Sequence, residues 1–122
     1  MKKILFIEDE QTLQKTISRY LEQEGYQVNN ALDGEIGLEI AKKEKPDLIL
    51  LDIILPKKNG FEVLKELKED ETTKDIPVII LTNLEGNNDV EKALSLGATT
   101  YLIKANYKLE EISNKIKETL NQ

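Results

Sequence analysis

The stretch Pro46-Asp47-Leu48-Ile49-Leu50-Leu51-Asp52 decides how this chain folds. Four consecutive apolar residues follow a proline and an acid and end at a second acid. That pattern is typical of a short strand buried on both faces of a parallel sheet. Similar apolar runs lie at residues 4–7, 78–81 and 101–103, and a weaker one lies around 26–31. We therefore predict five strands.

Amphipathic helix patterns separate these runs, because apolar residues recur there every three or four positions. The stripes are Leu13, Ile17 and Leu21; Phe61, Leu64 and Leu67; Val90, Ala93 and Leu94; and Leu109, Ile112, Ile116 and Leu120, with a weaker helix over 35–43. Asp33 is expected to cap that weaker helix, and Gly25 and Gly97 to end two others. Five strand–helix repeats predict an α/β fold, a doubly wound three-layer sandwich that forms one domain over residues 1–122.

The composition excludes several kinds of chemistry. The 122 residues include no cysteine and no histidine, so disulfides, thiol catalysis, histidine bases and His-ligated zinc are excluded. The net charge of −6 argues against nucleic-acid binding, which depends on neutralising phosphates with Lys and Arg. No apolar run approaches the length that spans a membrane. We expect a cytoplasmic protein that binds neither membrane nor nucleic acid directly.

Polar residues follow four of the predicted strands. Glu8 and Asp9 follow the first, Asp52 the third, Thr82 the fourth and Lys104 the fifth. In doubly wound folds, ligands bind at this edge of the sheet. Three clustered acids repel one another unless a cation compensates them, and Mg²⁺ prefers such oxygen ligands. Added to these acids, a lysine and a threonine suit phosphoryl transfer, and aspartate is a known phosphoryl acceptor.

These features together resemble the receiver domains of two-component response regulators. The resemblance covers the whole chain and rests on residues 4–10, on residues 46–52 with Leu55-Pro56 and Gly60 behind them, on residues 78–82 and on residues 97–104. It implies a flavodoxin-like (βα)5 fold with the parallel strand order 2-1-3-4-5. It also implies a phosphoryl-accepting signalling switch within a phosphorelay.

The resemblance assigns a role to each site residue. Asp52 is expected to accept the phosphoryl group. Mg²⁺ is expected to bind Asp9, Asp52 and the main-chain carbonyl of Ile54 directly, and Glu8 through water. The remaining roles go to Thr82 and Lys104, which would contact the phosphoryl group, and to Tyr101, which would turn inward as the switch.

The implied partners are a sensor histidine kinase or histidine phosphotransfer protein as donor, and a downstream protein as target. The chain is expected to be a monomer or a phosphorylation-promoted homodimer. Because the sequence contains no further domain after Gln122, we expect a stand-alone switch or a receiver cut from a longer regulator.

Two positions differ from the family pattern. Asn83 stands where a small residue is common, and it is expected to narrow access to Asp52. Ala105 stands where a proline is common, so a cis peptide after Lys104 would cost about 3 kcal/mol. We therefore expect that this loop can place Lys104 differently.

The residues flanking the expected attack path are Ile54 and Leu84. Both are apolar and cannot orient a water molecule, which predicts slow self-dephosphorylation and argues against a turnover enzyme. A haloacid-dehalogenase-type phosphatase would need an acid at position 54. A flavodoxin would need a phosphate cradle where Glu8 and Asp9 stand. A phosphorylation-independent pseudo-receiver, a binding module only, stays open as the main alternative.

Overall fold

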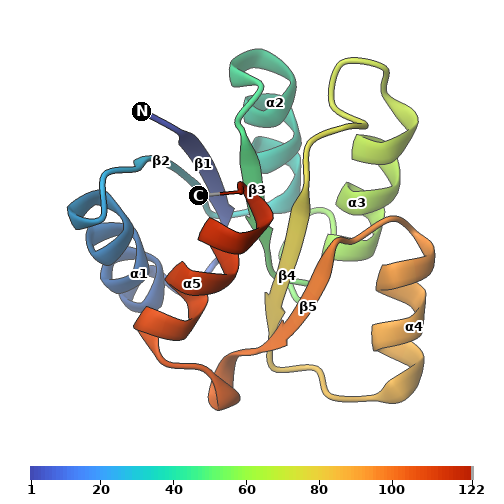
Figure 1. The fold of residues 1–122 in the computed structure, drawn as a ribbon. Coiled ribbons are helices and arrows are strands. Elements are labelled where there is room, and N and C mark those ends of the chain that lie inside the picture. Colours follow the sequence, from blue (N-terminus) through green and yellow to red (C-terminus); the bar gives the residue numbers. More distant parts are fainter. Residues whose placement is uncertain (122) are drawn as a thin grey trace.

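A computed structural model describes residues 1–121, and Gln122, the last residue of the expected domain, lies outside the described residues. Five parallel strands form one sheet in the order β2-β1-β3-β4-β5 (Figure 1). The strands are β1 (Lys3–Ile7), β2 (Gln27–Ala31), β3 (Leu48–Leu51), β4 (Val78–Thr82) and β5 (Thr100–Ile103). The helices are α1 (Gln11–Gln23), α2 (Gly34–Glu44), α3 (Gly60–Glu69), α4 (Asn87–Ser95) and α5 (Leu109–Thr119), with a 3-10 helix η1 (Lys104–Asn106) before α5. The predicted fold and strand order are confirmed.

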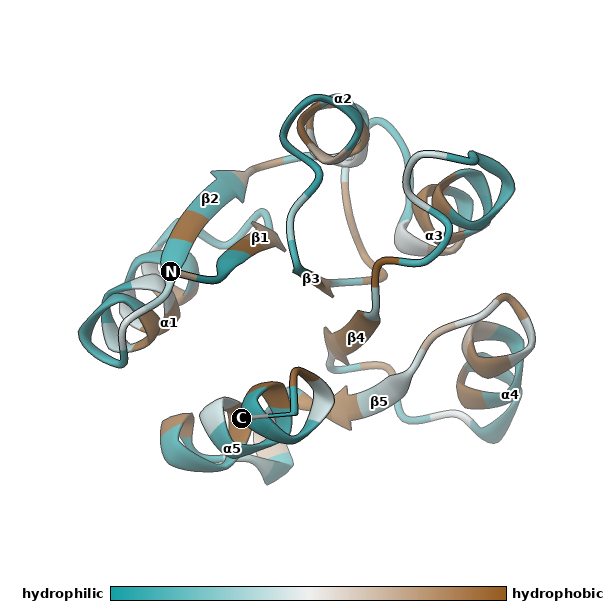
Figure 2. Cartoon of the chain, turned by 45° about the horizontal axis from the view of Figure 1, so that its top comes forward, coloured by the Kyte–Doolittle hydropathy of each residue, from teal (hydrophilic) through white to brown (hydrophobic). Residues whose placement is uncertain are grey.

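Two clusters of apolar side chains, one on each face of the sheet, pack between the sheet and the helices. Successive residues of a strand point to opposite faces. Ile4 and Phe6 therefore join the cluster beneath α1 and α5, whereas Leu5 and Ile7 join the cluster beneath α2, α3 and α4. Every residue of β3 and β4 is buried, and Figure 2 shows both strands in the apolar colour. Burial on both faces explains why these runs are continuous rather than alternating.

The helix ends follow the sequence signals. The Asp33 carboxylate accepts a hydrogen bond from the N–H three residues later at 2.8 Å, which confirms the predicted cap of α2. Beyond α1 and α4, Gly25 and Gly97 take φ values of 100° and 106°, as their predicted positions require. Helix α3 has a reciprocal cap that the sequence analysis did not assign: Asn59 and Glu62 each accept a hydrogen bond from the other's backbone N–H.

Helix α4 differs from its predicted pattern. Leu94 was expected on the buried face with Val90 and Ala93, but 47% of Leu94 is exposed and only Ala93 is buried in this helix. The helix is short and lies against β5, an edge strand, so it has a narrower surface to cover than a helix over the sheet centre. That prediction for Leu94 was wrong.

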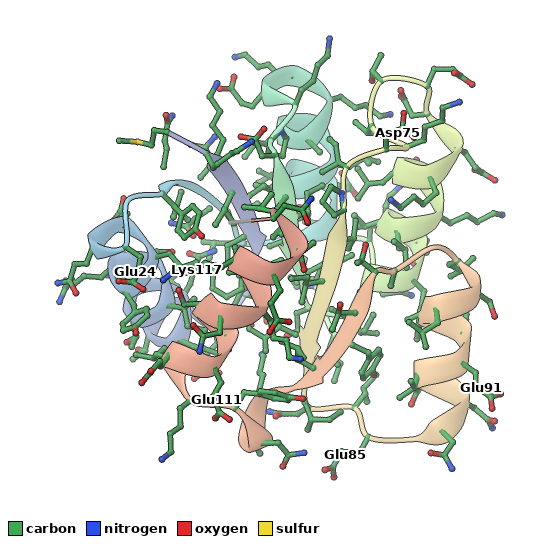
Figure 3. All side chains as sticks on the ribbon, viewed as in Figure 1. Glu24, Asp75, Glu85, Glu91, Glu111 and Lys117 are labelled. Atoms are coloured by element: carbon green, nitrogen blue, oxygen red, sulfur yellow. The ribbon has the colours of Figure 1, made fainter. Side chains whose placement is uncertain are left out.

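Polar contacts join α1 to α5 on the other face. The Glu24 carboxylate accepts hydrogen bonds from Lys117 Nζ at 3.1 Å and from Ser113 Oγ at 3.3 Å, and Figure 3 shows Glu24 and Lys117 side by side. None of the helices within residues 1–121 is both long and apolar enough to cross a lipid bilayer.

All five strands run in the same direction, so their carboxyl ends meet at one edge, the lower edge in Figure 1. The chain winds outward from β1 in both directions, with β2 on one side and β3 on the other. Ligand sites of such folds lie where the strand order reverses in this way. The residues that follow β1 and β3 are therefore the first candidates for a site.

Candidate phosphoryl and metal site

Three carboxylates meet at this edge. Glu8 and Asp9 follow β1 and Asp52 follows β3, and one carboxylate oxygen of each lies within 4.8 Å of the others. Glu8 is fully buried, Asp52 is 4% exposed and Asp9 is exposed. The parallel pairing of the two strands continues past their ends, because the Asp52 N–H donates to the Ile7 carbonyl at 3.1 Å. The sequence analysis correctly predicted that these acids converge.

Lys104 lies between two of these acids. Its Nζ is 2.6 Å from Glu8 Oε1 and 2.9 Å from Asp52 Oδ2, and its side chain is 13% exposed. Strand alternation explains the meeting, since Glu8, Asp52 and Lys104 continue the positions of residues 6, 50 and 102, which all face α1 and α5.

The substitution of alanine for proline after Lys104 does not displace this side chain. No cis peptide bond occurs within residues 1–121, so Lys104 is joined to Ala105 by a trans bond. The Lys104 ammonium nevertheless lies against both acids. The loop therefore keeps Lys104 beside the two acids, although alanine follows it.

Burial and charge shift the proton affinities of the pair. Burial raises the pKa of Glu8, and the neighbouring Asp52 charge adds to this, while contacts with Lys104 and with the Glu10 N–H oppose it. Burial alone would lower the pKa of Lys104, but its bonds to Glu8 and Asp52 outweigh that effect and raise it. Lys104 is therefore a fixed positive charge at this site.

The donor set fits a divalent cation. When all three acids are ionised, they exceed the single ammonium by two negative charges, and carboxylate oxygens are the ligands that hard divalent cations prefer. Glu8 already has partners on both oxygens: Lys104 at Oε1, through an ion pair without hydrogen-bond alignment, and the Glu10 N–H at Oε2. Asp9 is the most exposed of the three acids.

The loop after Asp52, residues 53–59, carries Ile54. The Ile54 N–H donates to Asp52 Oδ1 at 3.3 Å, and the Ile54 side chain is 58% exposed. Behind it, the Gly60 N–H donates to the Ile53 carbonyl at 2.8 Å. A Cβ on Gly60 would lie 2.3 Å from the Asp52 carbonyl oxygen, so only glycine permits this close approach.

Thr82 lies on the opposite face from the lysine. It continues the positions of Val78 and Ile80, which face α2, α3 and α4, and it is fully buried. Its Oγ1 accepts the Leu84 N–H at 3.5 Å, and the Leu84 carbonyl accepts the Tyr101 hydroxyl at 2.9 Å. Thr82 is thus linked to Tyr101 through one residue of the loop after β4.

Tyr101 is half-buried and packs against the cluster beneath α2, α3 and α4. Burial raises the pKa of its hydroxyl, and the charges of Asp89 and Asp52 add to the rise, so the hydroxyl remains a hydrogen-bond donor. Asn83, the other departure from the family pattern, is exposed.

One residue of this site was missed by the sequence analysis. Gln14 of α1 is buried, and its side-chain amide donates to the main-chain carbonyls of Glu8 at 3.1 Å and Ala31 at 3.0 Å. It thereby fixes the backbone just before Asp9. The available signal was its position: Gln14 lies three residues before Ile17 on the apolar face of the helix, where a polar side chain needs a buried partner.

Comparison with known proteins agrees with this geometry. Residues 4–117 match the family model described as response regulator receiver domain. The chain is 39% identical to the DNA-binding dual master transcriptional regulator RpaA of Synechocystis over 122 residues, which cover all of this chain and 50% of that protein. The chain spans about half the length of this and another curated relative, the response regulator ArlR of Staphylococcus saprophyticus.

Solved structures give the same result. A CheY-like receiver domain protein from Methanospirillum hungatei is 29% identical, with a TM-score of 0.93 and coverage of 99% of this chain and 94% of that one. The receiver domain of the sensor histidine kinase PA1611 from Pseudomonas aeruginosa is also 29% identical, with a TM-score of 0.90 and coverage of 99% and 98%. That structure has a magnesium ion coordinated in its active-site cleft.

Proposed function

This chain belongs to the response regulator receiver domain family, and from that premise we propose that Asp52 is its phosphoacceptor. One observation carries the proposal: the partly buried Lys104 ammonium contacts both Asp52 and Glu8, with Asp9 beside them. When all three acids are ionised, the single ammonium leaves two negative charges in excess, and clustered like charges repel one another unless a further cation compensates them. Residues 1–122 would act as one receiver domain, a signalling switch rather than a turnover enzyme.

The donor is a phosphohistidine outside these 122 residues, carried by a sensor histidine kinase or a histidine phosphotransfer protein, because the 122 residues contain no histidine. A carboxylate oxygen of Asp52 attacks the phosphorus atom. A P–O bond forms as the P–N bond breaks, and its electron pair returns to the donor's ring nitrogen, which takes up a proton from solvent. Lys104 holds the Asp52 carboxylate before transfer and then neutralises a phosphoryl oxygen.

Asp9 and Asp52, with the Ile54 main-chain carbonyl, would hold Mg²⁺ directly, and Glu8 would act through water. Support comes from the three clustered carboxylates and from the magnesium ion in the PA1611 receiver structure. When bound, Mg²⁺ offsets the negative charge that the carboxylates and the phosphoryl group bring together.

Phosphorylation would change partner binding through Thr82. A dianionic phosphoryl group on Asp52 attracts the Thr82 hydroxyl, which at present accepts the Leu84 N–H. Moving that hydroxyl disturbs the link from Leu84 to Tyr101 and shifts the balance between two packings of α4 and β5. The partner that binds the changed surface is a downstream protein or a second copy of the chain. A cytoplasmic location is part of the same proposal.

The test is a mass measurement after treatment with acetyl phosphate and Mg²⁺. Wild-type protein should gain one phosphoryl group that hydroxylamine removes, and chelation of Mg²⁺ should prevent the gain. Asp52→Asn should gain none, while the matched control Asp89→Asn, an acid on α4, should behave as wild type. Hydroxylamine-sensitive phosphate on Asp52→Asn would contradict the assignment. No phosphate on wild-type protein would favour the pseudo-receiver, a binding module only.

A further inference from the structure

Gly34, in the connection between β2 and α2, touches the loop that carries Ile54. Gly34 begins α2, just after β2, and its N–H donates to the Pro56 carbonyl at 3.3 Å. A Cβ at this position would lie 1.9 Å from the Lys58 carbonyl oxygen and 2.8 Å from its carbonyl carbon. Because these are main-chain atoms, the conflict could be relieved only by moving the loop or the start of the helix.

The segment that Gly34 contacts is strained. Lys57 has a φ of 70°, in the left-handed region that non-glycine residues rarely adopt. The Lys58 N–H donates to the Pro56 carbonyl at 2.8 Å across it. A hydrogen bond between residues two apart around a positive φ is the rarer, strained form of the γ-turn. Such a turn persists only where its surroundings hold it in place.

The same loop is fixed at its other end by the contact of Gly60 with Ile53. Residues 53–59 are thus held on one side by α3 and on the other by α2. Ile54 lies inside this segment, and its N–H contacts Asp52 Oδ1. The contacts of Gly34 therefore bear on the part of the chain that would present a main-chain oxygen to the metal.

We propose that Gly34 is a positioning residue of the metal site: by closing against Pro56 and Lys58 it holds the γ-turn, and with it the Ile54 carbonyl, in place for a divalent cation. This inference rests on the proposed function, since the Ile54 carbonyl is a ligand only if the site binds Mg²⁺. Gly34 itself contacts neither the metal nor Asp52. It acts through the loop.

The direct test compares two substitutions in the same helix. Gly34→Ala places a methyl group against the Lys58 backbone, whereas the three atoms nearest to a Cβ on Gly37 all belong to the Ile7 side chain, the closest at 2.5 Å. Both strain the packing of α2, but only the first touches the loop. Calorimetric titration with Mg²⁺ should show about tenfold weaker affinity for Gly34→Ala and little change for Gly37→Ala. A tenfold loss is typical when a residue that supports a metal ligand is changed. At saturating Mg²⁺ both should reach the wild-type extent of phosphorylation by acetyl phosphate.

Amide hydrogen exchange on the metal-free protein separates this inference from the proposed function. Gly34→Ala should lower the protection of the Lys58 and Gly60 amides, and Gly37→Ala should not. If wild-type protein does not bind Mg²⁺, the metal assignment fails, and the exchange result still decides whether Gly34 holds the loop. Unchanged exchange and unchanged affinity in Gly34→Ala would overturn the proposal, as would an equal loss in Gly37→Ala.

A second pair of variants covers the case in which Gly34→Ala does not fold. Lys57 is exposed, so changes there should leave the core intact. Lys57→Val disfavours the positive φ and should weaken Mg²⁺ binding severalfold, whereas Lys57→Gly accepts that φ and should bind as wild type. Equal affinities for the two variants would mean that the γ-turn does not position the metal ligand, and the proposal would fail.

Discussion

The two loops beside Asp52 are built in opposite ways. The loop after β3, residues 53–59, is held by Gly34 on one side, by Gly60 on the other and by the reciprocal cap of Asn59 on α3. The loop after β4, residues 83–86, is mostly exposed, and Figure 3 shows Glu85 at its outer edge. The Leu84 backbone bonds to the Thr82 and Tyr101 hydroxyls, and its side chain packs against the cluster beneath α2, α3 and α4. No side chain caps the helix that follows.

The difference separates two requirements of a switch. A metal ligand must stay in place in both states, so the loop that carries Ile54 benefits from tight packing. A responding element must have two arrangements of similar free energy, so the loop after Thr82 benefits from few and replaceable contacts. In this chain the loop after β3 meets the first requirement and the loop after β4 meets the second. Three predictions test whether this contrast is real.

The largest effect is expected from adding one methyl group where each loop meets the helix that follows it. Gly60→Ala places a Cβ 2.3 Å from a backbone oxygen and should lower the free energy of unfolding by about 3 kcal/mol. A Cβ on Gly86 would meet only the Asp89 carboxylate, at 3.0 Å, so Gly86→Ala should cost about 0.5–1 kcal/mol. Urea unfolding measures both. Equal costs would mean that the two loops are equally constrained.

The next effect concerns the lifetime of the phosphorylated form. Leu84 is half-buried beside the site and offers no group that can orient water, so wild-type protein should lose its phosphoryl group slowly. Leu84→Glu should shorten the half-life on the order of tenfold, equivalent to about 1.4 kcal/mol of the barrier. The decay of the phosphorylated mass with time gives the rate.

The control for this prediction is Leu94→Glu, which adds the same acid to the exposed face of α4, away from the site. It should leave the half-life unchanged. A wild-type half-life of seconds would contradict the view that Ile54 and Leu84 fail to assist hydrolysis, and so would an unaltered rate in Leu84→Glu.

The smallest effect tests the link between Leu84 and Tyr101. Tyr101→Phe removes the hydroxyl that donates to the Leu84 carbonyl and should cost about 1 kcal/mol in unfolding free energy. Amide exchange should become faster in residues 83–86 and stay the same in residues 53–59. Tyr107→Phe, in the cluster on the opposite face, is the control. Faster exchange in both loops would show that they are coupled rather than independent.

The site could be predicted from the sequence to the extent that strand ends define it. Once the run before Asp52 is recognised as a buried parallel strand, the acids after β1 and β3 must share an edge, and Thr82 and Lys104 follow by the same rule. Gln14 and Gly34 could not be assigned roles in that way. Their partners are main-chain carbonyls of other segments, and the side-chain pattern does not identify those carbonyls even where, as for Gln14, it shows that a partner is needed.

The sequence by itself determined the number and burial of the strands, because apolar periodicity records which faces of each element are covered, whereas their order in the sheet was an implication of the family resemblance. It also determined that the chain can place three acids, a hydroxyl and an ammonium at one edge. Only the tertiary structure decided that Lys104 contacts both Glu8 and Asp52 despite Ala105, and that the loop after Asp52 is held while the loop after Thr82 is loosely held. Those outcomes depend on strand register and on distances between segments far apart in the chain, which local periodicity does not encode.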